Sequence, residues 1–180
     1  MRQFSTVLIL LLASWGSLTR VQAQPPARGS AVREAFLADL NDLEKKLTSL
    51  AEAIPQDKFG WRPAKGVRSF SEVYMHTALS NYYFVSAFGA KIPAGISDSA
   101  EKTVTQKAKV IEALKASMTF VRQTVTNLPE ADLHKMTRME GLETTYEGSL
   151  IAIAGHMHEH LGQLIAYART NGIVPPWSRE

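Results

Sequence analysis

Three histidines lie close together near the C-terminal end of the chain, at positions 156, 158 and 160. If this segment is helical, His156 and His160 project from one face, about 40° apart around the axis. Ile153 and Leu164 bracket the pair at spacings of 3 and 4, so that face borders the apolar side of the helix. Two imidazoles on one face can bind one metal ion, whereas His158 lies about 200° from His156 and faces elsewhere.

His76 is the candidate for a third ligand, from another helix. It follows Val73 by three residues in a segment whose apolar spacing predicts a helix. A neutral imidazole among apolar side chains still needs hydrogen-bond partners, and a shared metal ion removes this difficulty. Three neutral histidines with an open position suit Zn²⁺, Ni²⁺ or another borderline divalent ion. We therefore predict a metal site of His76, His156 and His160, although a single histidine on an apolar face is more often an ordinary core residue.

Glu159 lies beside the histidine pair and is the candidate catalytic base, with Tyr167 as a further base or orienting group. The alternative for Glu159 is an exposed helix charge. The segment also fits the His-x-x-Glu-His pattern of inverted zinc peptidases, but those enzymes resemble much larger two-layer proteins, so this interpretation is disfavoured. His134 and His158 are expected at the surface.

Four predicted helices must position these side chains. Apolar residues recur at spacings of 3 and 4 in residues 31–54, from 69 to about 88, in 103–128 and in 144–171. Each helix has an apolar stripe that needs a partner, which predicts an all-α four-helix bundle. The inward stripe of the second helix is expected to contain these residues: Val73, His76, Ser80, Tyr83 and Ala87.

Helix ends are marked by short signals. Residues 69–72, 103–106 and 144–147 each match a capping box, and Gly172 is placed just past a helix end. Residues 55–66 form a connection rich in Pro and Gly, and residues 129–143 lack clean periodicity, which indicates an irregular connection. No strand pattern is visible in the sequence.

The composition limits the class of protein. The chain has 180 residues, of which 45% are hydrophobic and 21% charged, enough for one globular domain. It contains no Cys, so thiolate metal sites and cysteine nucleophiles are excluded. The formal charge is +3, but Arg2 and Arg20 lie in a leader without acidic residues. The remainder is close to neutral and has no basic stripe, so we expect no nucleic-acid partner.

Residues 1–23 are predicted to be a signal peptide. A short basic start is followed by the apolar run 7–13 and a small-x-small pattern ending at Ala23. An uncleaved membrane anchor is the alternative, but the run is shorter than the ~20 residues of a spanning helix. We expect a flexible lead-in at 24–30, one domain at 31–180, no stable membrane insertion after cleavage, and a periplasmic or secreted location.

The segment from His156 to Trp177 resembles the C-terminal part of the DinB family of bacterial proteins. It has a histidine pair, then His-x-Gly-Gln, an aromatic residue, Arg, Gly and a Pro-Pro end. Residues 54–63 and 69–76 resemble the family's connection into its second helix and that helix's histidine. The resemblance spans residues 31–178 and implies a four-helix bundle with metal bound by His76, His156 and His160. Dimerisation through helix faces is in keeping with it.

Some members of this family are metal-dependent thiol transferases or isomerases, which the resemblance therefore implies as one activity. An exported member would not meet abundant reduced thiol, which argues against thiol transfer. We expect a divalent-metal-dependent enzyme whose site activates water or a thiol for hydrolysis or transfer of a small-molecule substrate. The alternatives are a non-catalytic exported binding or sensor module with a structural metal, and an interaction bundle without metal.

Overall fold

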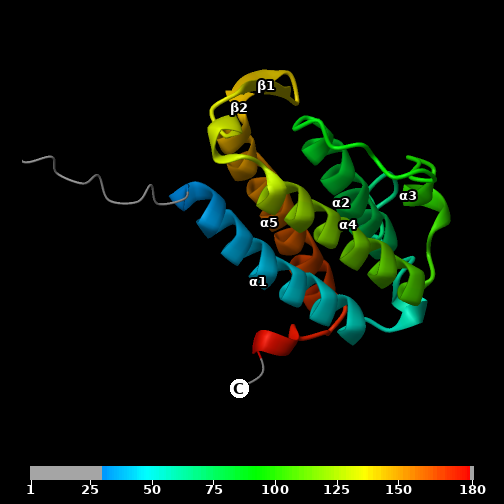
Figure 1. Ribbon diagram of the computed structural model, residues 1–180. Helices are drawn as coiled ribbons and strands as arrows, with labels where there is room; N and C mark the ends of the chain where they lie inside the picture. The colour runs from blue at the N-terminus through cyan, green and yellow to red at the C-terminus, as the bar shows by residue number, and fades with distance from the viewer. Residues whose placement is uncertain (1–29, 179–180) are drawn as a thin grey trace, which may run out of the picture.

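The computed structural model describes residues 30–178, and the predicted signal peptide lies outside these residues. Four long helices make up most of the fold: α1 (Ala31–Ala53), α2 (Phe70–Ser86), α4 (Lys107–Asn127) and α5 (Tyr146–Thr170) (Figure 1). The short elements are α3 (Ala100–Thr103), the strands β1 (Met136–Met139) and β2 (Leu142–Thr145), and 3₁₀ turns at Gln56–Lys58, Glu130–Asp132 and Pro176–Ser178. Within residues 30–178, no helix is both long enough and apolar enough to cross a membrane.

The four long helices form the predicted bundle, but not in the order of the chain. α4 and α5 each pack against both α1 and α2, so consecutive helices α1 and α2 lie mainly across the bundle from each other (Figure 1). The long connection of residues 54–69 makes this crossing possible. Because α2 and α5 are neighbours, side chains from the two predicted histidine segments can meet.

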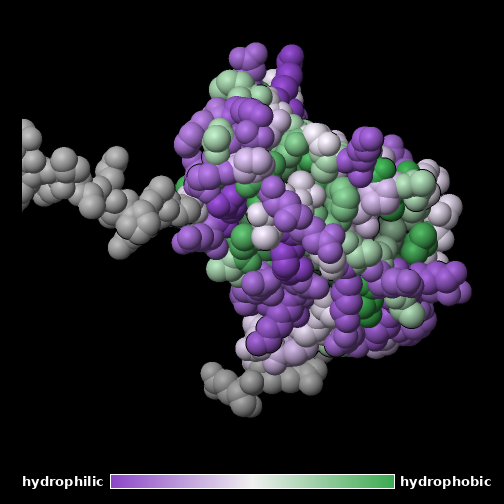
Figure 2. Space-filling model, viewed as in Figure 1, coloured by the Kyte–Doolittle hydropathy of each residue, from purple (hydrophilic) through white to green (hydrophobic). Residues whose placement is uncertain are grey.

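The core confirms the apolar periodicity of the first helix. Its six predicted stripe positions are all buried: Phe36, Leu40, Leu43, Leu47, Leu50 and Ile54. They meet the buried side chains of α4 and α5 in one continuous core. Burial of these apolar side chains is the main favourable contribution to the fold. The outward surfaces of α1 and α4 are covered mostly by hydrophilic residues (Figure 2).

The predicted inward stripe of α2 is wrong in part. Val73 is buried, but Tyr83 is 41% exposed and donates its hydroxyl to Asp98. Tyr74 and Asn81, which the stripe omitted, are fully buried. The reason is that α2 packs against α4, α5 and α3, and therefore buries most of its circumference. A helix that is buried on several sides has no single apolar stripe that the sequence pattern could reveal.

The prediction of an irregular connection without strands at residues 129–143 is wrong, because this region contains a hairpin. β1 and β2 pair antiparallel as a hairpin, with Met139 opposite Leu142. The two residues at the turn, Glu140 and Gly141, have φ angles of 49° and 85°, as a type I′ turn requires. Strands of four residues without alternating polarity leave too little pattern to recognise.

The helix caps follow the predictions to different degrees. The capping box of Ser69 and Glu72 is present, and Gly172 lies past the end of α5 with a φ of 73°. The box predicted at 103–106 is wrong, because α3 ends at Thr103 and the Gln56 side chain caps the Lys107 N–H instead.

The box predicted at residues 144–147 is absent, and the N-cap of α5 lies one residue later than predicted. Thr145 is the N-cap of α5 and accepts a hydrogen bond from the N–H of Gly148. The Glu147 carboxylate does not close the box but accepts a hydrogen bond from the hydroxyl of Ser30. That contact ties the start of α5 to the start of α1.

Candidate metal centre

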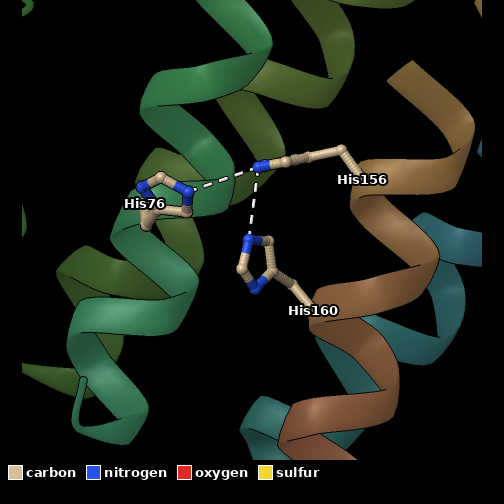
Figure 3. A group of neighbouring side chains, drawn as sticks. All are labelled: His76, His156 and His160. Carbon is tan, nitrogen blue, oxygen red and sulfur yellow. Dashed lines mark hydrogen bonds between the residues drawn. The ribbon is translucent and has the colours of Figure 1, made fainter. Parts of the chain in front are cut away.

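Three imidazole rings from two helices meet at one point in the bundle. His76 comes from α2, and His156 and His160 come from consecutive turns of α5 (Figure 3). The Nε2 atom of His156 lies 3.2 Å from the Nε2 atom of His76 and 3.2 Å from that of His160. One nitrogen from each ring lies within 4.8 Å of the other two. The structure thus brings the three predicted residues together with their Nε2 atoms facing one another.

The outward nitrogens of the three rings have different surroundings. His76 Nδ1 lies 3.2 Å from a carboxylate oxygen of Glu101, the second residue of α3. His160 Nδ1 lies 2.9 Å from the amide oxygen of Gln163, one turn further along α5. His156 Nδ1 is buried without a hydrogen-bond partner among the described residues.

Burial favours the neutral form of two of the rings, His156 and His76. Burial lowers the pKa of His156 to about 4, and the neighbouring rings His160 and His76 add to the effect. Burial also lowers the pKa of His76, with a further contribution from the charge of Arg68. A histidine must be neutral to offer a lone pair to a metal ion. At neutral pH, His76 and His156 are therefore ready to act as ligands without first losing a proton.

The donor set and its spacing fit a divalent ion. In a tetrahedral zinc site with Zn–N bonds of about 2.0–2.1 Å, two ligand nitrogens lie about 3.3 Å apart. The two Nε2 separations of 3.2 Å match that spacing. The contacts of His76 and His160 with Glu101 and Gln163 are of the kind that orient metal-binding histidines.

A cavity of about 500 Å³ opens beside the three rings, and it is lined by Arg68, His76, Glu140, Ala152, Gly155, His156, Glu159 and His160. The candidate base Glu159 is exposed and lies on its wall, as does Glu140 at the hairpin turn. Gly155 leaves space there, because a Cβ atom added to it would meet nothing within 4 Å. The cluster is therefore accessible to a small molecule from one side.

Among the described residues, no hydrogen bond joins the remaining sequence candidates directly to the three rings. His158 is exposed and contacts the carboxylate of Asp39 at 2.9 Å, and His134 is exposed. Tyr167 is buried, and its hydroxyl contacts Gln163 rather than a histidine. Glu101 was missed because it lies in a four-residue helix with no pattern of its own, 25 residues from His76.

Solved structures with the same fold come from two Bacillus species. A DinB-like protein from Bacillus cereus is 16% identical, with a TM-score of 0.70, and the match covers 79% of this chain and 95% of that one. A DinB-like protein from Bacillus subtilis is 19% identical, with a TM-score of 0.60, covering 77% of this chain and 92% of that one. YfiT from Bacillus subtilis, described as a probable metal-dependent hydrolase with an unusual four-helix bundle topology, is 16% identical, with a TM-score of 0.61, covering 84% of this chain and 94% of that one.

Among proteins with curated descriptions, none matches this sequence. A family model does match it, over residues 30–164, and this model describes the DinB superfamily. The matched residues include all of the four-helix bundle except the last turns of α5. They also include His76, His156 and His160. The chain therefore belongs to the DinB superfamily.

Proposed function

We propose that this protein is a metal-dependent enzyme that hydrolyses or transfers a group of a small-molecule substrate. In this proposal, His76, His156 and His160 hold a divalent ion, Zn²⁺ or Ni²⁺, through their Nε2 atoms. The observation that carries it is the convergence of these three nitrogens, with His156 Nε2 3.2 Å from each of the other two. Imidazoles that share one point from two helices need a common partner, and a divalent ion supplies it.

The chemistry that a bound divalent ion supplies is a lowered pKa of water or of a thiol, which generates a nucleophile at neutral pH. Around it, the protein provides a cavity of about 500 Å³ on one side of the histidines. Glu159 lies on the cavity wall and can accept the proton that the nucleophile loses. Gly155 has no side chain and that of Ala152 is a single methyl group, so the cavity beside His156 leaves room for a substrate against α5.

Two observations support an enzyme over a module with a structural metal. A structural zinc site is closed by four protein ligands, whereas the described residues provide a cluster of three. The side chain of His76 is 24% exposed, and the cavity gives access to all three rings. The hydrolase description of YfiT, a protein of the same fold, is in keeping with this choice.

Elemental analysis of the purified protein tests the site. We expect about one equivalent of a divalent metal in the unchanged protein and a loss of at least nine-tenths of it in His156→Ala, because two imidazoles hold an ion far more weakly than three. His158→Ala is the matched control, since this histidine is two residues away on the same helix and contacts Asp39 instead. Equal metal content in all three proteins would refute the proposed ligands.

Ligand exchange separates the enzyme from the structural module. Cobalt(II) substituted into the site reports its ligands through visible absorption bands. We expect added azide or a small thiol to shift these bands, because an open position accepts an outside ligand. A cobalt spectrum that neither compound changes would indicate a closed site and would favour the non-catalytic module.

A further inference from the structure

Arg68, which lines the cavity, orients Glu101 through its side chain. Its guanidinium Nε donates to one carboxylate oxygen of Glu101 at 3.0 Å, and the other oxygen of that carboxylate contacts His76 Nδ1. The ion pair with the guanidinium, and the Lys102 ammonium 3.7 Å from the same oxygen, favour the ionised carboxylate of Glu101. An ionised carboxylate can only accept hydrogen bonds. His76 must therefore carry its proton on Nδ1, which leaves the lone pair of Nε2 facing the centre.

The main-chain carbonyl of Arg68 is linked to His160 through the side chains of Tyr167 and Gln163. The hydroxyl of Tyr167 donates to the carbonyl oxygen of Arg68 at 3.2 Å. The same hydroxyl accepts from the amide nitrogen of Gln163 at 2.8 Å. The amide oxygen of Gln163 then lies 2.9 Å from His160 Nδ1.

The donor and acceptor roles along these hydrogen bonds follow from the group at their end, the main-chain carbonyl of Arg68. A main-chain carbonyl can only accept, so the Tyr167 hydroxyl must give its hydrogen to Arg68. The oxygen of Tyr167 is then left to accept from the amide nitrogen of Gln163, which turns the amide oxygen toward His160. His160 must donate from Nδ1, so in the neutral ring the Nε2 lone pair also faces the centre. We call the hydrogen bonds that join Glu101, Arg68, Tyr167 and Gln163 to the two rings the Arg68 network.

His156 lies outside this network. Its Nδ1 has no hydrogen-bond partner among the described residues, and its Nε2 lies 3.2 Å from the Nε2 atoms of His76 and His160. The network therefore orients two of the three rings.

We propose that the Arg68 network fixes His76 and His160 as Nδ1–H tautomers, and that Tyr167 is a positioning residue for the His160 lone pair. This inference rests on the proposed metal site, but the tautomers can be measured in the metal-free protein.

The tautomers can be measured directly. Long-range ¹H–¹⁵N spectra of the metal-free protein at neutral pH distinguish protonated from unprotonated ring nitrogens. We expect His76 and His160 to be protonated on Nδ1. A His160 ring protonated on Nε2 in the unchanged protein would overturn the proposal. The result stands whether or not the protein binds zinc, so it is independent of the proposed function.

Tyr167→Phe removes one hydroxyl and leaves the ring in place. Without it, the amide of Gln163 is free to rotate and present its nitrogen to His160, which moves the proton of that ring to Nε2. We expect the spectrum to show this shift and the zinc affinity to fall about 10-fold to 100-fold, as when other outer partners of ligands are removed. Tyr82→Phe is the matched control, because Tyr82 is buried on α2 and its ring packs against Phe120, which is not part of the network.

A second substitution distinguishes positioning from loss of structure. Gln163→Glu places a carboxylate next to His160. Because an ionised carboxylate can only accept, donation from His160 Nδ1 no longer depends on Tyr167. We expect Tyr167→Phe combined with Gln163→Glu to regain the Nδ1–H tautomer and most of the zinc affinity, without regaining thermal stability. A double variant that stays as weak as Tyr167→Phe would refute the role of Tyr167. If Tyr167→Phe does not fold, the spectrum of the unchanged protein decides the proposal.

Discussion

Glu72 is the residue that fixes the start of α2, and through α2 the position of His76. Its carboxylate accepts from the backbone N–H of Ser69 at 2.6 Å and pairs with Lys102 and Arg62, each at 3.1 Å. Burial alone would raise the pKa of Glu72, but these three donors outweigh it and lower the pKa to about 2. One carboxylate therefore holds together the 55–69 connection, α2 and α3.

The lowered pKa of Glu72 predicts a pH-dependent stability. Because the ionised form is favoured in the folded state, its contribution is complete above the ordinary pKa of 4.5 and disappears as the pH falls toward 2. We expect Glu72→Gln to lower the free energy of unfolding by about 2–3 kcal/mol at pH 7 and by almost nothing near pH 2. Denaturant titrations across this pH range measure the difference.

Glu34→Gln provides the control for that measurement. Glu34 also lies in the first turn of a helix but is exposed, and no ion pair of the described residues involves it. We expect its substitution to change the stability by less than about 0.5 kcal/mol. An equal loss in both variants, or a loss in Glu72→Gln that persists at pH 2, would contradict the assigned ion pairs.

At the scale of elements, the hairpin is placed so that its turn reaches the cavity beside the histidines. Glu140 lines that cavity and has a φ of 49°, a left-handed conformation that is costly for most residues. The hairpin is attached to the bundle by buried Met139 and by the hydroxyl of Thr137, which donates to the carbonyl of Ala87. This anchoring keeps the turn over the site.

The turn conformation predicts a stabilising substitution. Asn is favoured at the first position of a type I′ turn followed by Gly, so Glu140→Asn should raise the free energy of unfolding by about 0.5–1 kcal/mol. Thermal or denaturant unfolding measures the gain. Glu143→Asn, on β2 opposite Arg138, should give no gain, because Asn is disfavoured in strands. A stabilisation of equal size at both positions would contradict the turn argument.

At the scale of the whole molecule, the proposed ion would join α2 to α5. These helices are neighbours, although 80 residues separate His76 from His156. An ion that binds only the folded chain stabilises it by about 2.7 kcal/mol at a free concentration 100 times its dissociation constant. For a domain of this size, that corresponds to a rise in Tm of about 5–10 °C.

We therefore expect zinc to raise the Tm of the metal-free protein and a chelator to reverse the rise. His76→Ala should abolish it, because this variant leaves both ligands on one helix and removes the link to α2. His158→Ala should keep the full rise. If His76→Ala responds to zinc as the unchanged protein does, the ion binds elsewhere.

The bundle and its three histidines illustrate how far sequence patterns reach. The stripe of α1 and the capping box of Ser69 and Glu72 depend on local spacing, and the structure has both. The stripe of α2 failed because three neighbouring elements bury that helix, and which elements surround a helix is not a local property. The hairpin was not predicted because its two short strands are held in place by contacts with the bundle, which local sequence spacing does not reveal.

The sequence by itself determined the helices, and it placed His156 and His160 on one face because a helical period of 3.6 residues dictates this. Tertiary structure alone decided that α2 lies beside α5, and therefore that His76 comes within 3.2 Å of His156. It also decided which groups lie behind the rings: Glu101 from α3 and the main-chain carbonyl of Arg68. The physical reason is range: helical spacing acts over one or two turns, whereas these contacts depend on packing between segments that are tens of residues apart.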